Sequence, residues 1–352
     1  MRNALKLVYA TVVIVVMAFL ARTCFGVRGP RAMQTSAAPP TPEALHAAAA
    51  VDTTRPADAS QYTVRPGPQE LLANDSLSGP LFTELAARYQ PALADFKTAA
   101  AGAGAKLVVV SFGVDGGKHA TELERRADSV IRAAAKTVGV PYYDFAGALD
   151  SATAAGASVT IDKDGHVSKI GSALVAAGIA RILDSIGGYR SAHAFGANER
   201  PTTFGDFKPL EDDVVDLGNG HPYLLKVNSQ GLRMNFDLGF PKTKQRVLLM
   251  GSSLAYFPFI DNDKTATGLL QAKYPSKEFL NAAMLAFGIR DDLELFIDKT
   301  QYAEPDILIL QQSGMDIVRL FFTIRNFEDR ARRYHPPSPL EKAWYAAHYP
   351  GK

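Results

Sequence analysis

Short, largely apolar runs recur from about residue 107 onward, and stretches with helical spacing of apolar positions lie between them. Residues 247–250 are four apolar residues in succession, with no polar side to turn toward water, so this run predicts a strand buried on both faces of a sheet. Such strands alternating with helices are typical of a parallel α/β sheet. The predicted strands are residues 107–110, 140–145, 247–250, 279–280 and 307–310, and the predicted helices are 81–96, 123–138, 173–186, 266–273 and 291–299.

The predicted strands fall into two groups, two before residue 187 and three after residue 223. Either group alone would leave an unpaired apolar sheet edge, which invites aggregation. We therefore predict one flavodoxin-like three-layer α/β sandwich of about five parallel strands over residues 76–352, with a first part 76–187, a long connection 188–223 and a second part 224–352. The acidic residues 211–213 in the connection predict a solvated patch rather than a metal site, because no further ligand follows at suitable spacing.

The amino-terminal region differs in composition from the rest of the chain. Residues 7–21 form an uninterrupted apolar run between basic residues, a little short of the ~20 residues that a spanning helix prefers. We predict a signal-anchor or transmembrane segment over residues 1–27, with a cleaved signal peptide as the alternative because the apolar length suits either. Residues 28–75 are rich in Ala, Pro, Thr and Ser, which predicts a flexible linker.

Charge and cysteine content bear on a nucleic-acid partner and on disulfide bonds. The net charge of +2 comes from Lys and Arg that are spread along the chain, which gives no reason to expect a nucleic-acid partner. Cys24 is the single cysteine, so an intrachain disulfide is excluded. A length of 352 residues with 47% hydrophobic composition is enough for a sizeable core.

Gly251-Ser252-Ser253 follows the apolar run 247–250 and precedes a helical pattern. Glycine adopts backbone angles that other residues resist, so this turn can hold Ser253 at the carboxyl end of its strand, where open α/β sheets bind ligands. A serine in that place is a candidate nucleophile. The alternative is that a serine here only caps the following helix.

Asp164 and His166 lie upstream in a short turn. A serine hydroxyl becomes a good nucleophile when an imidazole takes its proton, and a carboxylate fixes the tautomer of that imidazole. Asp164 and His166 can supply this pair, Asp162 is an alternative carboxylate, and Ser168 is expected to cap the next helix. A solvated surface turn is the alternative interpretation of the same residues.

Together these motifs resemble the SGNH (GDSL-like) hydrolase superfamily over roughly residues 80–330. Gly251-Ser252-Ser253 resembles its first block, with Ser252 in place of the usual aspartate. Residues 281–288 resemble the second block, residues 312–316 the third, and Asp164-Gly165-His166 the last. Because the last block precedes the others here, the order is similar to the circularly permuted domain of the AlgX and AlgJ alginate O-acetyltransferases.

The resemblance implies acyl transfer without a cofactor or a metal ion. Ser253 would be the nucleophile, His166 the acid and base, and Asp164 the carboxylate that orients it. The backbone amide of Ser253 would form an oxyanion hole together with an amide at Ala286 or Gly288.

The third block departs from the superfamily pattern. Met315 stands where an asparagine is expected and cannot donate a hydrogen bond, so either Gln312 or Ser313 replaces that donor or the oxyanion hole is weaker than usual. Gln312 and Tyr256 are also candidates to line the substrate cleft, although an aromatic residue after such a turn is as often a packing residue.

The resemblance further implies a role in polysaccharide biosynthesis. We expect an exported, single-pass protein of the inner (cytoplasmic) membrane whose globular domain O-acetylates a polysaccharide on the periplasmic side, with a membrane-bound O-acyltransferase as candidate partner. An esterase of the same fold, acting on carbohydrate or lipid esters, is one alternative. A catalytically degenerate carbohydrate-binding or assembly component is another, and Met315 favours it.

Overall fold

The computed structural model describes residues 75–112, 122–161, 165–217, 220–285 and 287–314. The chain divides into two compact units, Met1–Pro66 and Gly67–Lys352. The first unit lies wholly outside the described residues, so the signal-anchor segment and the linker stay predictions. Among the helices of the described ranges, none combines the length and the apolar character needed to cross a membrane.

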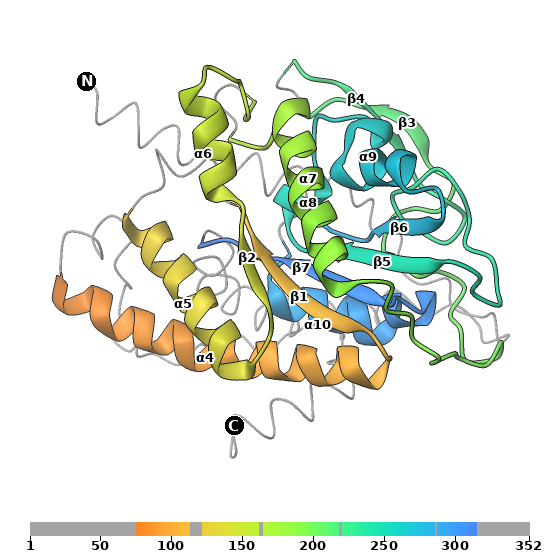
Figure 1. The fold of residues 1–352 in the computed structure, drawn as a ribbon, viewed down its shortest axis with the longest axis horizontal. Helices are drawn as coiled ribbons and strands as arrows, with labels where there is room; N and C mark the ends of the chain where they lie inside the picture. Colours follow the sequence, from red (N-terminus) through yellow and green to blue (C-terminus); the bar gives the residue numbers. More distant parts are fainter. Residues whose placement is uncertain (1–74, 113–121, 162–164, 218–219, 286, 315–352) are drawn as a thin grey trace, which may run out of the picture. The chain divides into compact units, whose positions relative to one another are not determined.

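Five parallel strands form one sheet in the order β2-β1-β7-β5-β6 (Figure 1). Strand β1 pairs with β7 from Lys106 opposite Ile307 to Val110 opposite Gln311, so both halves of the chain contribute to the same sheet. This confirms the prediction of a single sheet built from both halves. The strands are β1 (Lys106–Ser111), β2 (Tyr142–Asp144), β5 (Gln245–Met250), β6 (Lys277–Asn281) and β7 (Ile307–Gln311).

The strand order becomes flavodoxin-like when the chain is followed from β5. If β5, β6, β7, β1 and β2 are renumbered 1 to 5, the sheet read from β6 to β2 has the strand order 2-1-3-4-5 of a doubly wound fold. The direction of winding reverses between β5 and β7. Open α/β sheets bind ligands outside the carboxyl ends of the strands at such a point. The carboxyl ends of β5 and β7 are therefore the expected location of a site.

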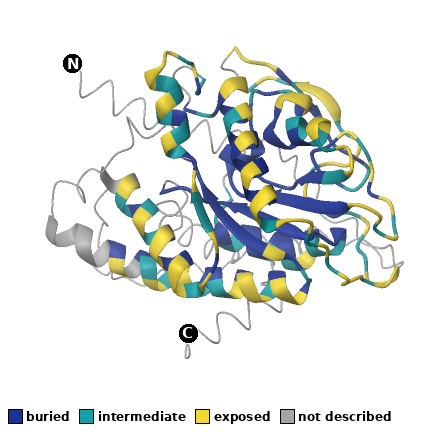
Figure 2. Ribbon diagram, viewed as in Figure 1, coloured by how far each residue is buried: buried dark blue, intermediate teal, exposed yellow. Residues whose placement is uncertain are grey.

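Helices cover both faces of the sheet and complete three layers. One buried cluster joins α4 (Asp75–Gly102), α5 (Glu122–Val138) and α10 (Ile289–Asp298) to strand residues such as Val109. The other joins α6 (Ala146–Ala154), α7 (Lys169–Ile186) and α9 (Ala266–Lys273) to residues such as Val108. Figure 2 shows buried strands between helices whose outer faces are exposed. The central strands β1, β5 and β7 contain apolar runs because successive strand residues face opposite buried layers, whereas the edge strand β2 is only partly buried.

Most of the predicted helices agree with the structure. Helix α9 has the predicted bounds, and Ser168 caps α7, its hydroxyl accepting the amides of Ile170 at 3.1 Å and Gly171 at 3.2 Å. Helix α4 begins earlier than predicted and continues through Pro91. Helix α6 is not predicted by the pattern, because it consists mainly of small residues.

The connection 188–223 contains a short strand that the sequence pattern does not predict. Strand β3 (Asp212–Val215) lies within it and pairs antiparallel with β4 (Tyr223–Lys226), which begins at its end. The side chains of Asp212 and Asp213 are exposed, as expected of a solvated acidic patch. An acidic strand of four residues gives a weak pattern because most of its length faces solvent.

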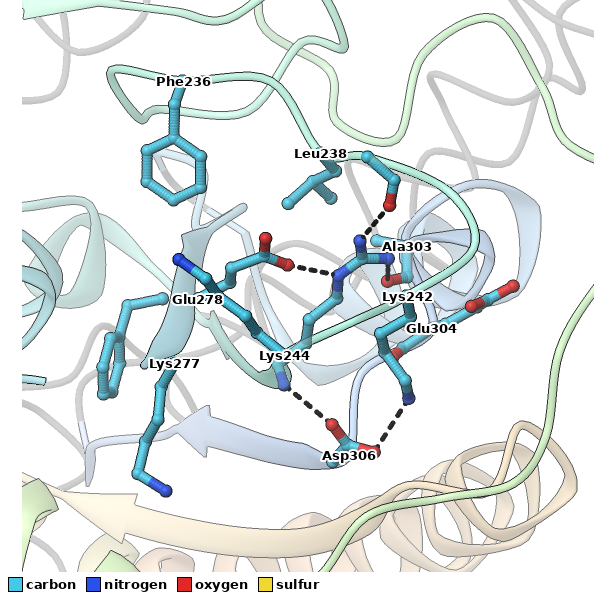
Figure 3. A network of polar contacts seen from close by, with 12 residues as sticks. Phe236, Leu238, Lys242, Lys244, Lys277, Glu278, Ala303, Glu304 and Asp306 are labelled. Carbon is cyan, nitrogen blue, oxygen red and sulfur yellow. Dashed lines mark hydrogen bonds and ion pairs between the residues drawn. The ribbon is translucent and has the colours of Figure 1, made fainter. Parts of the chain in front are cut away.

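A buried carboxylate fastens the connection to the amino edge of the sheet. Asp306, immediately before β7, accepts the backbone amides of Ser191 at 2.6 Å and Arg246 at 2.7 Å. It also pairs with Nζ of Lys242 at 2.8 Å, as Figure 3 shows. The segments that lead from α7 to β5 are thereby held at the edge opposite the carboxyl ends of the strands.

Arg246 extends this network across the same edge. Its guanidinium is fully buried and donates to Glu278 on β6 at 2.7 Å and to the carbonyls of Ala303 at 2.8 Å and Gly239 at 2.6 Å. The described bonds of the Arg246 guanidinium thus lie at the amino edge of the sheet, opposite the carboxyl ends of the strands.

Candidate active site

The turn after β5 is built around Gly251. Its φ of 139° lies in the region that favours glycine, and a Cβ here would lie 2.6 Å from the carbonyl oxygen of Gln311 on β7. Ser252 occupies the N-cap position of α8 (Ser253–Tyr256), but its side chain makes no capping bond and donates to Oε1 of Gln311 at 3.2 Å. Ser253 is the first residue of α8 and is 3% exposed. The turn thus holds Ser253 at the carboxyl end of β5, as the sequence predicts.

The end of β6 supports the same turn. Nδ2 of Asn281 donates to the carbonyl of Ala255 at 3.0 Å, and its Oδ1 accepts the amide of Ala283 at 2.9 Å. The amide of Met284 donates to the carbonyl of Gly251 at 3.0 Å. The segment that resembles the second block therefore lies directly beside the serine turn and fixes the direction of α8.

His166 lies in the turn before α7, and its ring is edge-on to the ring of Phe259, with 5.8 Å between the ring centroids. Phe259 belongs to the segment that continues α8, so the structure brings the histidine turn against the chain that follows Ser253. Asp162 and Asp164 lie outside the described residues. The carboxylate that orients His166 therefore stays a prediction.

Helix α7 is fastened to the same region by a second contact. Oγ of Ser172, a buried residue in its first turns, donates to the carbonyl of Lys264 at 2.9 Å. Lys264 ends the short 3-10 helix η3 (Asn262–Lys264), which follows the segment that carries Phe259. The histidine turn is thus held close to this segment by the packing of a whole helix, and not by one ring contact alone.

Residues 256–260, which follow the serine turn, have an unusual backbone. Phe257 and Phe259 have φ values of 60° and 67°, and such angles cost on the order of 1–3 kcal/mol each in residues other than glycine. Tyr256 is buried, and its hydroxyl lies 2.7 Å from that of Tyr223. Tyr256 therefore packs in the interior, and its contact with a substrate stays a prediction.

Arg233 is a residue of this region that the sequence does not reveal. Its guanidinium donates to the carbonyls of Tyr256, Ile260 and, at 3.0 Å, Phe257, while its Nε donates to Oδ1 of Asn262 at 2.9 Å. Burial lowers the pKa of the Arg233 guanidinium. The sequence does not indicate this role, because backbone carbonyl acceptors carry no signature in the sequence.

Two of the predicted oxyanion donors are engaged in other bonds. The amide of Gly288 donates to the carboxylate of Asp291 at 2.8 Å, where it caps α10. Nε2 of Gln312 donates to the carbonyl of Gln311 at 2.8 Å and to Oδ2 of Asp292 at 3.3 Å, so this buried amide turns toward α10.

The remaining predicted oxyanion donors are Ser253, Ala286 and Ser313. Ser313 is buried just beyond the carboxyl end of β7, while Ala286 and Met315 lie outside the described residues. Ser253 opens α8, and the first amides of a helix have no acceptor within that helix. In the described part of the chain, no three His, Cys, Asp or Glu side chains gather as a metal ion would require.

The described residues define a class of fold, a doubly wound parallel α/β sheet in permuted chain order with a buried serine after β5. No protein-family model and no curated protein matches the chain. Among solved structures, the chain is similar to the O-acetyltransferase domain of Pseudomonas putida AlgJ, at 15% identity and a TM-score of 0.45, over 67% of this chain and 84% of that chain. That protein is of the type that the motif order resembles, although similarity at this level does not show an activity.

Proposed function

We propose that this chain is an SGNH-like O-acetyltransferase that acetylates an extracytoplasmic polysaccharide through an acetyl-serine intermediate. The observation that carries the proposal is the place of Ser253 after β5, where the winding reverses, with His166 against the segment that follows it. The acetyl group, the polysaccharide acceptor and the anchorage to the inner membrane rest on the motif resemblance alone.

The reaction would proceed in two balanced steps. As Oγ of Ser253 attacks the acetyl carbonyl, His166 takes the hydroxyl proton, and collapse of the adduct expels the donor alcohol with that proton and leaves acetyl-Ser253. His166 then takes the proton of a sugar hydroxyl while the oxygen of that hydroxyl attacks the acetyl carbonyl. Collapse releases the acetylated sugar, and the proton returns to Ser253. Asp164 would hold the imidazole in the required tautomer.

The oxyanion of both adducts needs donors that are fixed in advance. The amide of Ser253 at the start of α8 would be one, and losing such a donor typically costs about 3–4 kcal/mol of barrier. Gly288 and Gln312 are bonded elsewhere, which favours a second candidate function, a carbohydrate-binding component that has lost catalysis.

Burial of Ser253 supports transfer over hydrolysis. Ser253 is 3% exposed as a residue, so we expect water to have little access to an acetyl group on it before a bound sugar hydroxyl replaces the donor. The esterase alternative differs from the transferase only in accepting water at this step.

The test uses the purified full-length chain with a chromogenic acetyl ester, with and without oligosaccharide acceptors. Ser253→Ala is expected to abolish ester cleavage, whereas the matched change Ser252→Ala at the adjacent buried serine should keep most of it. Acetylated oligosaccharide detected by mass spectrometry selects the transferase, and cleavage without it selects the esterase. Oligosaccharide binding without any cleavage selects the binding component, and full activity in Ser253→Ala rejects the nucleophile.

A further inference from the structure

We propose that Arg233 is a positioning residue, which holds residues 256–260 in the one conformation that sets Phe259 against His166. Its effect on acyl transfer rests on the proposed function, while the contact that it creates between Phe259 and His166 can be tested without any activity. Arg233 itself touches neither Ser253 nor His166 among its described bonds.

The guanidinium acts on both ends of the unusual segment. It donates to the carbonyls of Tyr256 and Phe257 at the end of α8 and to the carbonyl of Ile260 beyond Phe259. The carbonyls of Tyr256 and Ile260 flank the two residues with positive φ, Phe257 and Phe259, so a single rigid group spans the whole stretch. A planar guanidinium can satisfy several carbonyls at fixed angles, which a flexible ammonium cannot.

The guanidinium is itself fixed from the other side. Oδ1 of Asn262 accepts its Nε at 2.9 Å, and Nδ2 of Asn262 donates to the carbonyl of Lys226 on β4 and, at 3.1 Å, to Oδ1 of Asn235. The backbone amide of Arg233 also donates to the carbonyl of Asn281 at the end of β6, at 3.0 Å. Arg233 therefore links residues 256–260 to the ends of two strands, β4 and β6.

Stability alone is a poor reason for this arrangement. The hydrogen-bond acceptors described for Arg233 are carbonyl and amide oxygens, and its guanidinium also lies over the rings of Tyr223 at 5.3 Å and Tyr256 at 4.8 Å. Even with such partners, a buried charge is often no more stabilising than an apolar side chain of similar volume. What the cation supplies is a defined backbone at a place where two phenylalanines adopt angles that they would otherwise avoid. The ring of Phe259 leaves this backbone toward the imidazole of His166.

The test compares Arg233→Lys with Arg246→Lys. Arg246 is also a buried arginine that donates to two carbonyls, but it lies at the start of β5, at the amino edge of the sheet. The chemical shifts of the His166 ring protons, assigned with His166→Gln, report the contact with Phe259 at a fixed pH. We expect these shifts to change in Arg233→Lys only, and kcat of acetyl transfer to fall roughly 10- to 100-fold there with KM nearly unchanged.

Equal His166 shifts in the two lysine variants would overturn the proposal, whatever the activity. A second variant, Phe259→Leu, keeps Arg233 in place and covers the case in which Arg233→Lys does not fold. It should reproduce the fall in kcat, and an unchanged kcat in Phe259→Leu contradicts action through this ring. The two proposals can fail separately. If the His166 shifts change only in Arg233→Lys, the positioning contact is supported. If Ser253→Ala also leaves ester cleavage unchanged, the proposed function is overturned.

Discussion

Replacing Gly251 by alanine is expected to destabilise the fold and to remove ester cleavage together. An alanine at φ 139° would adopt a disfavoured backbone, at a cost of about 1–3 kcal/mol. Its Cβ would also lie 2.6 Å from the carbonyl oxygen of Gln311 and 2.9 Å from Cβ of the same residue, both within the buried sheet. Overpacking of this kind adds about 1–3 kcal/mol. The free energy of unfolding should therefore fall by about 2–6 kcal/mol.

Urea denaturation of the full-length chain, extrapolated to water, measures this change. The matched control is Gly147→Ala in α6, where an added Cβ meets nothing within 4 Å, so that the unfolding free energy should stay constant or rise by up to about 1 kcal/mol. A Gly251→Ala chain as stable as the wild type, with full ester cleavage, would refute the argument that β7 holds the serine turn.

Two further predictions concern stability alone. Asp306→Asn leaves the buried ammonium of Lys242 without its charged partner and should cost about 3–5 kcal/mol of unfolding free energy, whereas Asp263→Asn at the exposed pair with Lys264 should cost less than about 1 kcal/mol; equal losses would contradict this. Burial raises the pKa of Tyr142 above its ordinary value of 10.0, so the folded state keeps this proton longer than the unfolded state and stability falls as the pH rises above that value. Tyr142→Phe should remove this part of the alkaline loss in denaturation curves, and identical curves would contradict it.

The sheet could be predicted from the sequence because its central strands are largely buried on both faces. Residues 247–250 of β5 contain no polar position, and the edge that each half of the chain would leave exposed favours one sheet built from both halves, which the pairing of β1 with β7 confirms. Helix α6 and the β3-β4 hairpin gave no comparable signal, since small residues and exposed acidic residues lack a clear period.

The candidate site could be predicted from the sequence only in part. Gly251 and Ser253 follow from a glycine turn after a strand, and the packing of His166 against Phe259 agrees with the predicted meeting of two distant segments. Arg233 could not be found, because its acceptors are backbone carbonyls that any residue type supplies. The engagement of Gly288 by Asp291 likewise depends on where α10 begins, and helix boundaries are the least certain feature of a sequence pattern.

The most direct test of the central claim is a crystal structure of the full-length chain after reaction with an organophosphonate, a mimic of the tetrahedral adduct. We expect the phosphorus on Oγ of Ser253, with a ring nitrogen of His166 within hydrogen-bond reach of that oxygen, roughly 2.6–3.2 Å. A phosphonate on Ser252 or on another residue, or a His166 ring that points away from the adduct, would contradict acyl transfer by these two residues.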